Sequence, residues 1–471
     1  MRSLKLFFIA TISSSIFFST GALALSLQEY LSQVKNDNLG YNSSKINYES
    51  SNLLSKKATL LTTPTIFANA QTGFEKQNQA IAFVRYQQVD TQHYSAGVEQ
   101  NFSFGLYSKF YYNINRNEYQ GLNSALAVPL YYQTNPVLSL TMPLWKDRFG
   151  SAIRANQDSS YYSNQVNKFN SGFAAINFEI DSEKSYWQLV ATKKVIAISK
   201  NALNQAEKIL QNASKKAKMN LGEKADVLQA KADVESKKLQ LQQAENTAKI
   251  AARNFNQNRY INSDVVNEKL DEINFDSLEK FPINKIMVDS RYDVKAAAAN
   301  SKAVIAQAKI DEEDNKPQFD LYGSYGFNGL EITGSQAIGN SLTQAGDTAF
   351  VGIKFSMPIA IGLQSDIRKA DKANATAARM SYRQKVFNQE NDWQNLLQNL
   401  CYYQENLRLS RKIESLQKSK VENERSLLRQ GRTSTYQVLL FEQDYNQALI
   451  NTVNNAYQLL SLIAQRKHYE L

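Results

Sequence analysis

Hydrophobic side chains follow two different rhythms along this chain, and the first has a period of two. From Tyr94 to Phe104, apolar and polar side chains largely alternate. A strand places successive side chains on opposite faces, so this segment predicts a strand with one apolar and one polar face. Similar patterns predict strands in five further segments, which are residues 65–74, 107–116, 137–144, 319–327 and 351–357.

The second rhythm has the spacing of a helix. Five small or aliphatic side chains recur every three or four residues, at Ala202, Ala206, Ile209, Ala213 and Ala217. Such a stripe marks one face of a helix and lets neighbouring helices approach closely. A single helix over residues 151–219 would be roughly 100 Å long, far longer than the helices of ordinary globular domains. Coiled-coil or tubular packing is therefore expected.

The remaining segments give weaker patterns. Residues 25–62 and 283–314 are expected to be mostly helical, and each is followed by a proline. A mixed, charged connector is expected at 261–282 and a polar, glycine-rich loop at 328–347. Almost no glycine and no proline follow residue 362, which favours another long helical region.

Two glycine turns divide the long helical regions. Gly222 lies in the segment NLGEKADVLQA, and Gly431 lies in QGRTSTYQVLLFEQ. Glycine readily adopts the left-handed conformation that ends a helix, so each segment is interpreted as the tip of a helical hairpin. The alternative is that any two helix–turn–helix joints look similar, but the flanking sequences argue against it.

The order helix, proline, strands, long helix, glycine, helix occurs twice. Pro64 precedes a Gly-Phe pair at the same distance as Pro317 does, and Met-Pro and Trp-Gln pairs recur in the same order. These anchors predict a duplicated domain rather than a solenoid of short repeats. The first repeat spans 25–282, with strands at 64–146 and a hairpin at 151–260; the second spans 283–471, with strands at 317–358 and a hairpin at 363–468.

The N-terminus has the features of a secretory signal. Arg2 and Lys5 precede a short apolar run, and Ala22-Leu23-Ala24 fits the cleavage rule, so residues 1–24 are predicted to be a signal peptide. A retained membrane anchor is the alternative. No later segment is apolar for long enough to be a membrane helix, so a chain that crosses a membrane would use strands.

Together these features resemble the TolC-like outer-membrane efflux family, over nearly all of the mature chain. The resemblance implies a mainly α protein with membrane β-structure, in which three protomers form a strand barrel continued by a periplasmic helical barrel. It also implies a periplasmic adaptor and an inner-membrane transporter as partners. The chain departs from the family in its first half, which has four strand-like segments where two are usual. The additional pair, about residues 94–116, leaves the number of barrel strands open.

Charge and composition exclude several other functions. The net charge of +10 is spread along the helices among acidic residues, unlike the concentrated basic patch of a nucleic-acid binder. One cysteine, Cys401, and two distant histidines, His93 and His468, offer no metal site or disulfide. Cys401 is expected to be a packed thiol and the histidines surface or interface residues. Without a catalytic constellation or nucleotide motif, the protein is predicted to be neither an enzyme nor a cofactor binder.

Charged residues gather around both predicted tips. Lys224 and Asp226 follow Gly222, whereas Arg425, Arg429 and Arg432 surround Gly431. Solvated helix ends are one interpretation. The other is that Asp226 and Arg432 pair between neighbouring hairpins and hold the entrance of a tube shut. The resemblance implies an acidic selectivity ring near the second turn, but Gln437 and Leu440 stand there, which argues against a strongly cation-selective entrance.

The leading functional hypothesis is a trimeric exit duct in the outer membrane of a Gram-negative bacterium, exporting small molecules or proteins. The alternative is a periplasmic or surface coiled-coil scaffold without a pore; a secreted enzyme would need an acid–base pair that the sequence does not show. The strands discriminate between duct and scaffold. A duct exposes an apolar strand face to lipid, whereas a scaffold buries it in a core.

Overall fold

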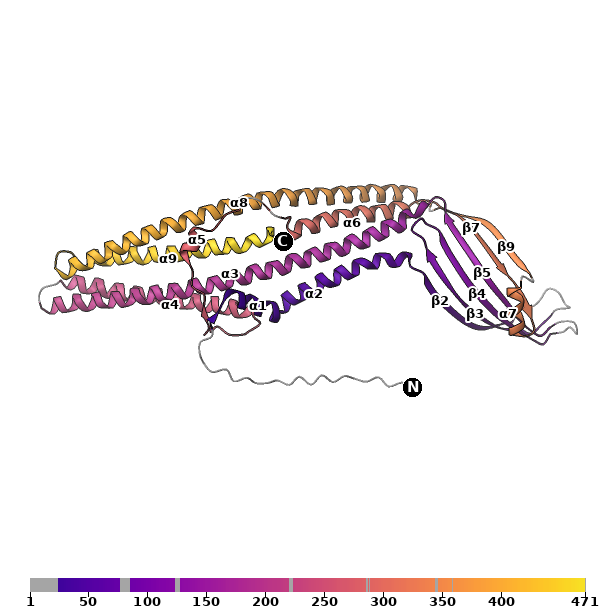
Figure 1. The fold of residues 1–471 in the computed structure, drawn as a ribbon, viewed down its shortest axis with the longest axis horizontal. Coiled ribbons are helices and arrows are strands. Elements are labelled where there is room, and N and C mark those ends of the chain that lie inside the picture. Colours follow the sequence, from indigo (N-terminus) through magenta and orange to yellow (C-terminus); the bar gives the residue numbers. More distant parts are fainter. Residues whose placement is uncertain are drawn as a thin grey trace. The chain divides into compact units, whose positions relative to one another are not determined.

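The protein is described by a computed structural model that covers residues 24–76, 85–122, 128–219, 223–284, 287, 289–343, 346–357 and 359–470. Helices predominate, and most strands belong to one large sheet (Figure 1). The chain forms two compact units. The helical unit contains Met1–Ser43, Ala175–Val288 and Trp393–Leu471, and the sheet unit contains Ser44–Ala174 and Asp289–Asp392. Each unit contains segments of both predicted repeats, so the division into units does not follow the repeats. The duplication therefore remains a proposal.

The sheet unit is built on an antiparallel sheet, in which seven strands lie in the described residues. The strand order is β2-β3-β4-β5-β7-β9, with the short β8 paired to β5. The first four strands are β2 (Thr65–Glu75), β3 (Gln88–Asn101), β4 (Tyr107–Gln120) and β5 (Leu130–Pro143). The others are β7 (Gln318–Phe327), β8 (Gly329–Glu331) and β9 (Asp347–Ser356). All six strand segments predicted from the alternation are confirmed, and the additional pair forms β3 and β4.

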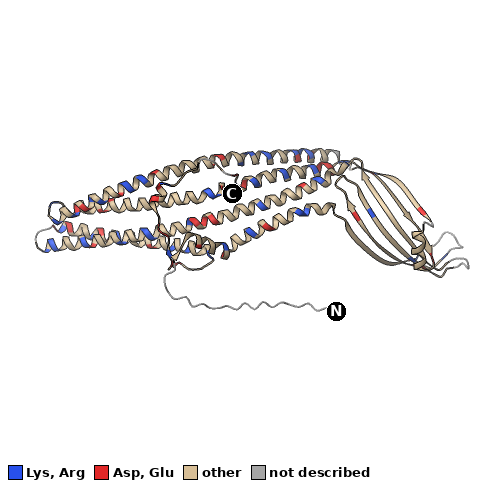
Figure 2. Cartoon of the chain, in the orientation of Figure 1, with Lys and Arg blue, Asp and Glu red and all other residues tan. Residues whose placement is uncertain are grey.

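Helices lead into and out of these strands. α2 (Leu39–Leu54) and the 3-10 helix η1 (Ser55–Thr62) precede β2, and the 3-10 helix η3 (Arg148–Gly150) and α3 (Ser151–Lys218) follow β5. α6 (Tyr292–Asp314) precedes β7, and α8 (Ile361–Arg429) follows β9. The single long helix predicted over residues 151–219 is confirmed by α3. Charged side chains of both signs are interspersed along the helices (Figure 2).

The helical unit packs the ends of α3 and α8 with shorter elements. These are α1 (Leu27–Asp37), α4 (Lys224–Asn258), α5 (Phe275–Glu279), α9 (Thr435–Gln465) and the 3-10 helix η4 (Arg466–Tyr469), with the small parallel pair β1 (Ala24–Leu25) and β6 (Lys269–Leu270). An aromatic group anchors its core. The rings of Tyr30 and Phe255 stack at 4.2 Å, and Tyr186 packs against both. The Tyr186 hydroxyl donates to Leu25 O at 2.9 Å and accepts from Asp271 N at 2.8 Å, which ties both strands to the core.

The predicted small-residue stripe of α3 is largely buried. Ala202, Ala206, Ile209 and Ala213 are each at most 7% exposed. Ile209 and Ala213 belong to a second apolar cluster with Ala230 of α4 and Val438 and Leu439 of α9. Ala217, beyond this cluster, is half-buried. The stripe is therefore a helix contact within the chain.

Two expectations about secondary structure are wrong. The helix expected from residue 283 begins only at Tyr292, because Arg291 at the N-cap position has a non-helical ψ of 149°. Just before it, Asp289 accepts hydrogen bonds from Ser290 N and Lys295 Nζ. The loop expected at 328–347 instead contains β8 and α7 (Gly334–Leu342). α7 is held on the sheet where Thr134 Oγ1 donates to Ala337 O at 2.7 Å. This contact joins residues 203 positions apart, which local sequence patterns do not reveal.

Candidate functional site

The second predicted tip is a helix end closed by glycine. Gly431 has a φ of 72°, in the left-handed region. Its N–H donates to Leu428 O at 3.1 Å, and Arg432 N–H donates to Leu427 O at 2.9 Å. This pair of bonds is the Schellman arrangement, which satisfies carbonyls at the end of α8. Ser434 then caps α9 by accepting from Gln437 N at 3.2 Å.

The first predicted tip lies partly outside the described residues. Gly222 lies outside the described residues. α3 ends at Lys218 and α4 begins at Lys224, after Glu223 at the N-cap position. Asp226 occupies the first turn of α4, where the positive end of the helix dipole favours a carboxylate.

The predicted pair Asp226–Arg432 is not formed within the chain. Asp226 is half-buried and Arg432 is exposed, and neither makes an ion pair with a residue in the described part of the chain. Lys224 is also exposed, and Gln437 is half-buried. Because the hypothesis places the pair between neighbouring hairpins of an assembly, it stays a prediction about contacts between copies.

A different ion pair, which the sequence analysis did not predict, joins α8 and α9 in the tip region. Arg425 of α8 makes a two-pronged contact with Glu442 of α9, with Nη2 at 2.8 Å from Oε2. Glu442 is only 4% exposed, so this carboxylate depends on its partner. Near it on α4, burial raises the pKa of Asp233, with Glu442 adding to the rise and Lys237 opposing it. Residues 425 and 442 lie unequally far from the turn, so sequence spacing alone did not indicate the pair.

A basic cavity of about 390 Å³ adjoins this ion pair. Five cationic side chains and no acidic side chain line it. They are Lys208, Lys215, Lys216, Arg425 and Arg429. The tip region therefore carries a cluster of positive charge, of which Arg425 is paired with Glu442.

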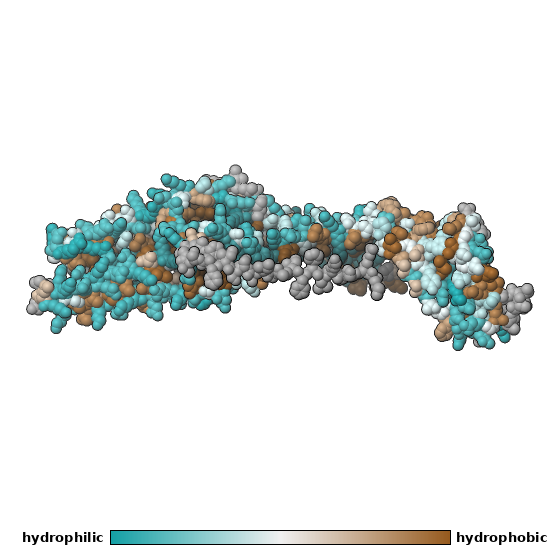
Figure 3. Space-filling model, turned by 60° about the horizontal axis from the view of Figure 1, so that its bottom comes forward, coloured by the Kyte–Doolittle hydropathy of each residue, from teal (hydrophilic) through white to brown (hydrophobic). Residues whose placement is uncertain are grey.

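One face of the sheet is apolar. Residues that pair across antiparallel strands share a face, and one such row runs through five strands: Ile66, Val98, Phe110, Leu138 and Tyr325. All five are at least 41% exposed in the single chain. In Figure 3, hydrophobic surface is spread over the strands, whereas hydrophilic surface covers most of the helical unit. This apolar face is therefore not the buried side of a β-core.

The opposite face is polar and mostly uncharged. Two neighbouring rows run across β2 to β5: Asn69, Ser95, Asn113, Asn135, and Gln71, His93, Asn115, Gln133. His93 Nδ1 lies 2.5 Å from Asn115 Oδ1, so the histidine is part of a hydrogen-bonded row. Where charges occur on this face, Lys109 and Glu99 lie opposite each other at 3.8 Å.

Other chemistry is sparse. The described residues contain no cluster of three metal-ligating side chains, and none of their helices has the length and apolarity needed to cross a membrane. Cys401 is exposed, so the expectation of a packed thiol is wrong; it lies on an outward face of α8.

The comparisons with known proteins agree with this architecture. No family model and no curated protein match the sequence. The solved structure of the outer-membrane channel OprN is similar over 94% of this chain and 89% of its own, with a TM-score of 0.65 and 18% identity. The outer-membrane protein VceC from Vibrio cholerae aligns over 94% and 95%, with a TM-score of 0.65 and 13% identity. The CmeC outer-membrane channel of Campylobacter jejuni aligns over 94% and 85%, with a TM-score of 0.60 and 16% identity. This chain has the fold of these outer-membrane channels.

Proposed function

We propose that the protein is a passive exit duct in the outer membrane of a Gram-negative bacterium. It works as a homotrimer with a periplasmic adaptor and an inner-membrane transporter, and it carries small molecules or secreted proteins. The observation that carries this proposal is the two-faced sheet, apolar and exposed on one side and polar on the other. Its long strands have 10 to 14 residues, enough to cross the hydrocarbon core at about 9–11 residues each.

The edges of the sheet support assembly from several copies. β2 and β9 are the two ends of the six-strand path, so each has one side without a partner strand in the described residues. An open edge is not viable in lipid, where every backbone group needs a partner. Since successive strands are antiparallel, β2 and β9 run in opposite directions. The β9 edge of one copy can therefore continue an antiparallel ladder with β2 of the next.

The strand count sets the width of the proposed pore. Six strands from each of three copies would make a barrel of about eighteen strands, against about twelve if β3 and β4 were missing. Barrels of sixteen to eighteen strands leave an aqueous channel. Because each copy contributes an even number of strands, neighbouring strands remain antiparallel all the way around the ring.

Fractionation and planar-bilayer recording of the purified protein test the proposal. We expect the mature chain in the outer membrane as a heat-sensitive trimer, and channels with a conductance above that of a twelve-stranded barrel. Recovery as a soluble periplasmic monomer without channel activity would contradict the duct and favour the coiled-coil scaffold. A trimer that inserts but has the conductance of a twelve-stranded barrel would contradict only the strand count.

A further inference from the structure

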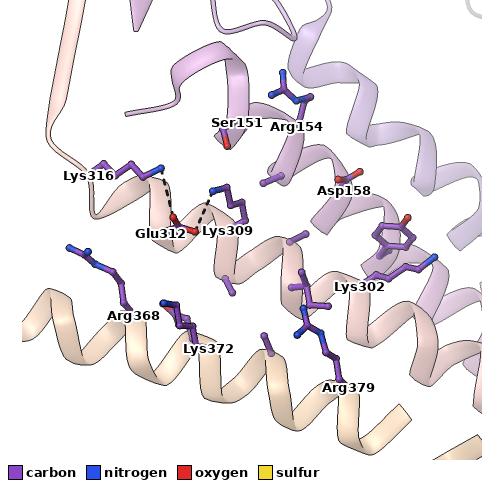
Figure 4. A pocket seen from close by; sticks show the side chains of 17 residues that line it. Ser151, Arg154, Asp158, Lys302, Lys309, Glu312, Lys316, Arg368, Lys372 and Arg379 are labelled. Atoms are coloured by element: carbon purple, nitrogen blue, oxygen red, sulfur yellow. Dashed lines mark hydrogen bonds and ion pairs between the residues drawn. The ribbon is translucent and has the colours of Figure 1, made fainter. Parts of the chain in front are cut away.

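A second basic cavity, of about 870 Å³, lies in the sheet unit among α3, α6 and α8 (Figure 4). We call it the basic pocket. The alanines Ala155, Ala306 and Ala375 among its lining residues are buried. Its charged lining contains seven basic and three acidic side chains. The basic ones are Arg154, Lys302, Lys309, Lys316, Arg368, Lys372 and Arg379, and the acidic ones are Asp158, Glu312 and Asp371.

Part of this charge is neutralised within α6 and the turn after it. Lys309 lies 3.3 Å from Glu312, and Lys316 lies 2.8 Å from Glu313, a buried carboxylate beside the pocket. These two lysines and two glutamates balance each other. Five basic and two acidic lining residues are left, so the pocket keeps an excess of positive charge.

The unbalanced charge is concentrated on one face of α8. Arg368, Lys372 and Arg379 are separated by four and seven residues, which places them on one side of the helix. They extend from α8 toward α6 in Figure 4. None of the three side chains makes an ion pair or hydrogen bond with a residue in the described ranges. Further along α8, in contrast, Arg408 is paired with Glu405 at 2.6 Å.

The pocket starts where the helices meet the strands. Ser151 opens α3 shortly after β5, Lys316 lies two residues before β7, and Arg368 is near the start of α8, which follows β9. If the sheet spans the membrane, as proposed above, this end of the pocket lies at the level of the lipid headgroups. Arg379 lies about 17 Å further along α8 than Arg368, at 1.5 Å per residue. With that placement, the far end of the pocket lies beyond the headgroups, where soluble molecules can reach it.

We propose that the basic pocket is a binding site for phosphate groups, with Arg368 and Lys372 as its main ligands. Guanidinium groups bind phosphate oxygens in pairs, and an ammonium group adds a point charge without a fixed geometry. Two sources share this chemistry. One is the headgroup of an anionic phospholipid, and the other is a soluble phosphate-bearing anion. The site itself does not depend on the duct, but the lipid source rests on the proposed function.

Binding to the purified, full-length protein tests the site with two probes. The first is phosphatidylglycerol against phosphatidylcholine in nanodiscs, with the lipids retained by each protein counted by native mass spectrometry. The second is inorganic pyrophosphate, measured by calorimetry in neutral detergent. The test variant is Arg368→Gln with Lys372→Gln. We expect it to bind at least one of the probes on the order of tenfold more weakly than the wild type.

A matched variant controls for net charge. Lys369→Gln with Arg383→Gln removes two charges from the same helix, but neither residue lines the pocket. This control is expected to bind both probes like the wild type. A loss confined to phosphatidylglycerol identifies the lipid, and a loss confined to pyrophosphate identifies a soluble anion. If the test variant binds both probes like the wild type, or if the control loses as much, the site does not exist.

The folding of the variants and the duct itself are checked separately. Trimer content and bilayer conductance of the same preparations report on the proposed function, whatever the probes show. If the double variant fails to fold, Arg368→Gln with Arg379→Gln replaces it, with the same expected loss. If the variants form normal channels and none of the pocket substitutions changes probe binding, the phosphate site is overturned and the proposed duct is not.

Discussion

At the scale of single residues, the small side chains of α3 determine how closely its neighbours approach. Ala206 and Ala213 are 3% and 5% exposed, so added volume has no free space to fill. Replacing either with Leu should lower the free energy of unfolding by about 1–3 kcal/mol, because overpacking forces neighbours to move. Thermal unfolding of the purified protein measures this. Ala232→Leu, at an exposed position of α4, is the control and should change little; equal, negligible effects at all three positions would show that the stripe is not a contact.

A half-buried carboxylate, Asp293 in the sheet unit, makes stability depend on pH. Burial of Asp293 favours a raised pKa, but hydrogen bonds from Arg291 and the charges of Arg291 and Lys385 outweigh it and lower the pKa overall. A carboxyl with a lowered pKa stabilises the folded state above its unfolded pKa, near 4, and loses this effect as the pH falls through the folded pKa.

Asp293→Asn should therefore lower the free energy of unfolding by about 1.5–3 kcal/mol at pH 7, the usual contribution of a hydrogen bond to a charged group. The deficit should shrink as the pH falls below 4. Melting temperatures between pH 7 and pH 3 measure the difference. Asp392→Asn removes the half-exposed partner of Arg291 and should have the smaller effect. A deficit that stays constant with pH would mean that the charge of Asp293 is not what stabilises α6.

At the scale of secondary-structure elements, the edge strands make a specific prediction about assembly. Asn69 lies on the polar face of β2, and the polar face of β9 carries Thr348, Phe350 and Gly352. In a Cys401→Ser background, cysteine at Asn69 should cross-link to cysteine at one of these three positions in another copy. Oxidised protein on denaturing gels would then run as covalent dimers and trimers.

The neighbouring β9 positions Ala349, Val351 and Ile353 face the apolar side and provide the controls. Cysteine there should not react with cysteine at Asn69, because strands in one ladder keep their faces aligned. Cross-links of equal yield to both sets would indicate random collisions. Their absence from both sets, in a protein that still inserts, would contradict the β2–β9 contact.

Local periodicity predicted the elements best where the pattern was long or regular. The alternation around Val98 and the stripe around Ala206 each predicted an element that the structure contains. The sequence did not reveal α7, because GSQAIGNSL contains two glycines and its position depends on a contact with the distant Thr134. The pair Arg425–Glu442 was missed for a related reason, since the relative rotation of two helices is fixed by packing and not by sequence spacing.

At the scale of the whole molecule, the distribution of charge predicts whether anions or cations pass more easily through the proposed duct. The polar face of the sheet carries two rows rich in amides, and all the charged side chains that line the cavity near the tip are cationic. A tube with this lining should slightly favour anions. In a KCl gradient across a bilayer, the reversal potential should shift toward that of chloride, and Lys215→Gln with Arg429→Gln should reduce the shift. A clear cation preference would show that these residues do not line the entrance.

The last prediction concerns closure at the tips. A closed tube must stop leakage where its hairpins converge, and Arg425 is already committed to Glu442 within the chain, whereas Asp226 and Arg432 have no ion-pair partner among the described residues. We therefore expect these two to pair between copies. One exposed pair contributes only about 0–1 kcal/mol, but three copies around a ring would hold a marginal closed state. Asp226→Arg or Arg432→Asp alone should raise the conductance and sensitise cells to large antibiotics that the wild type excludes. The double reversal should restore closure, because it exchanges the two charges without separating them. If the double variant leaks as much as either single variant, the pair does not exist, and another contact must close the tip.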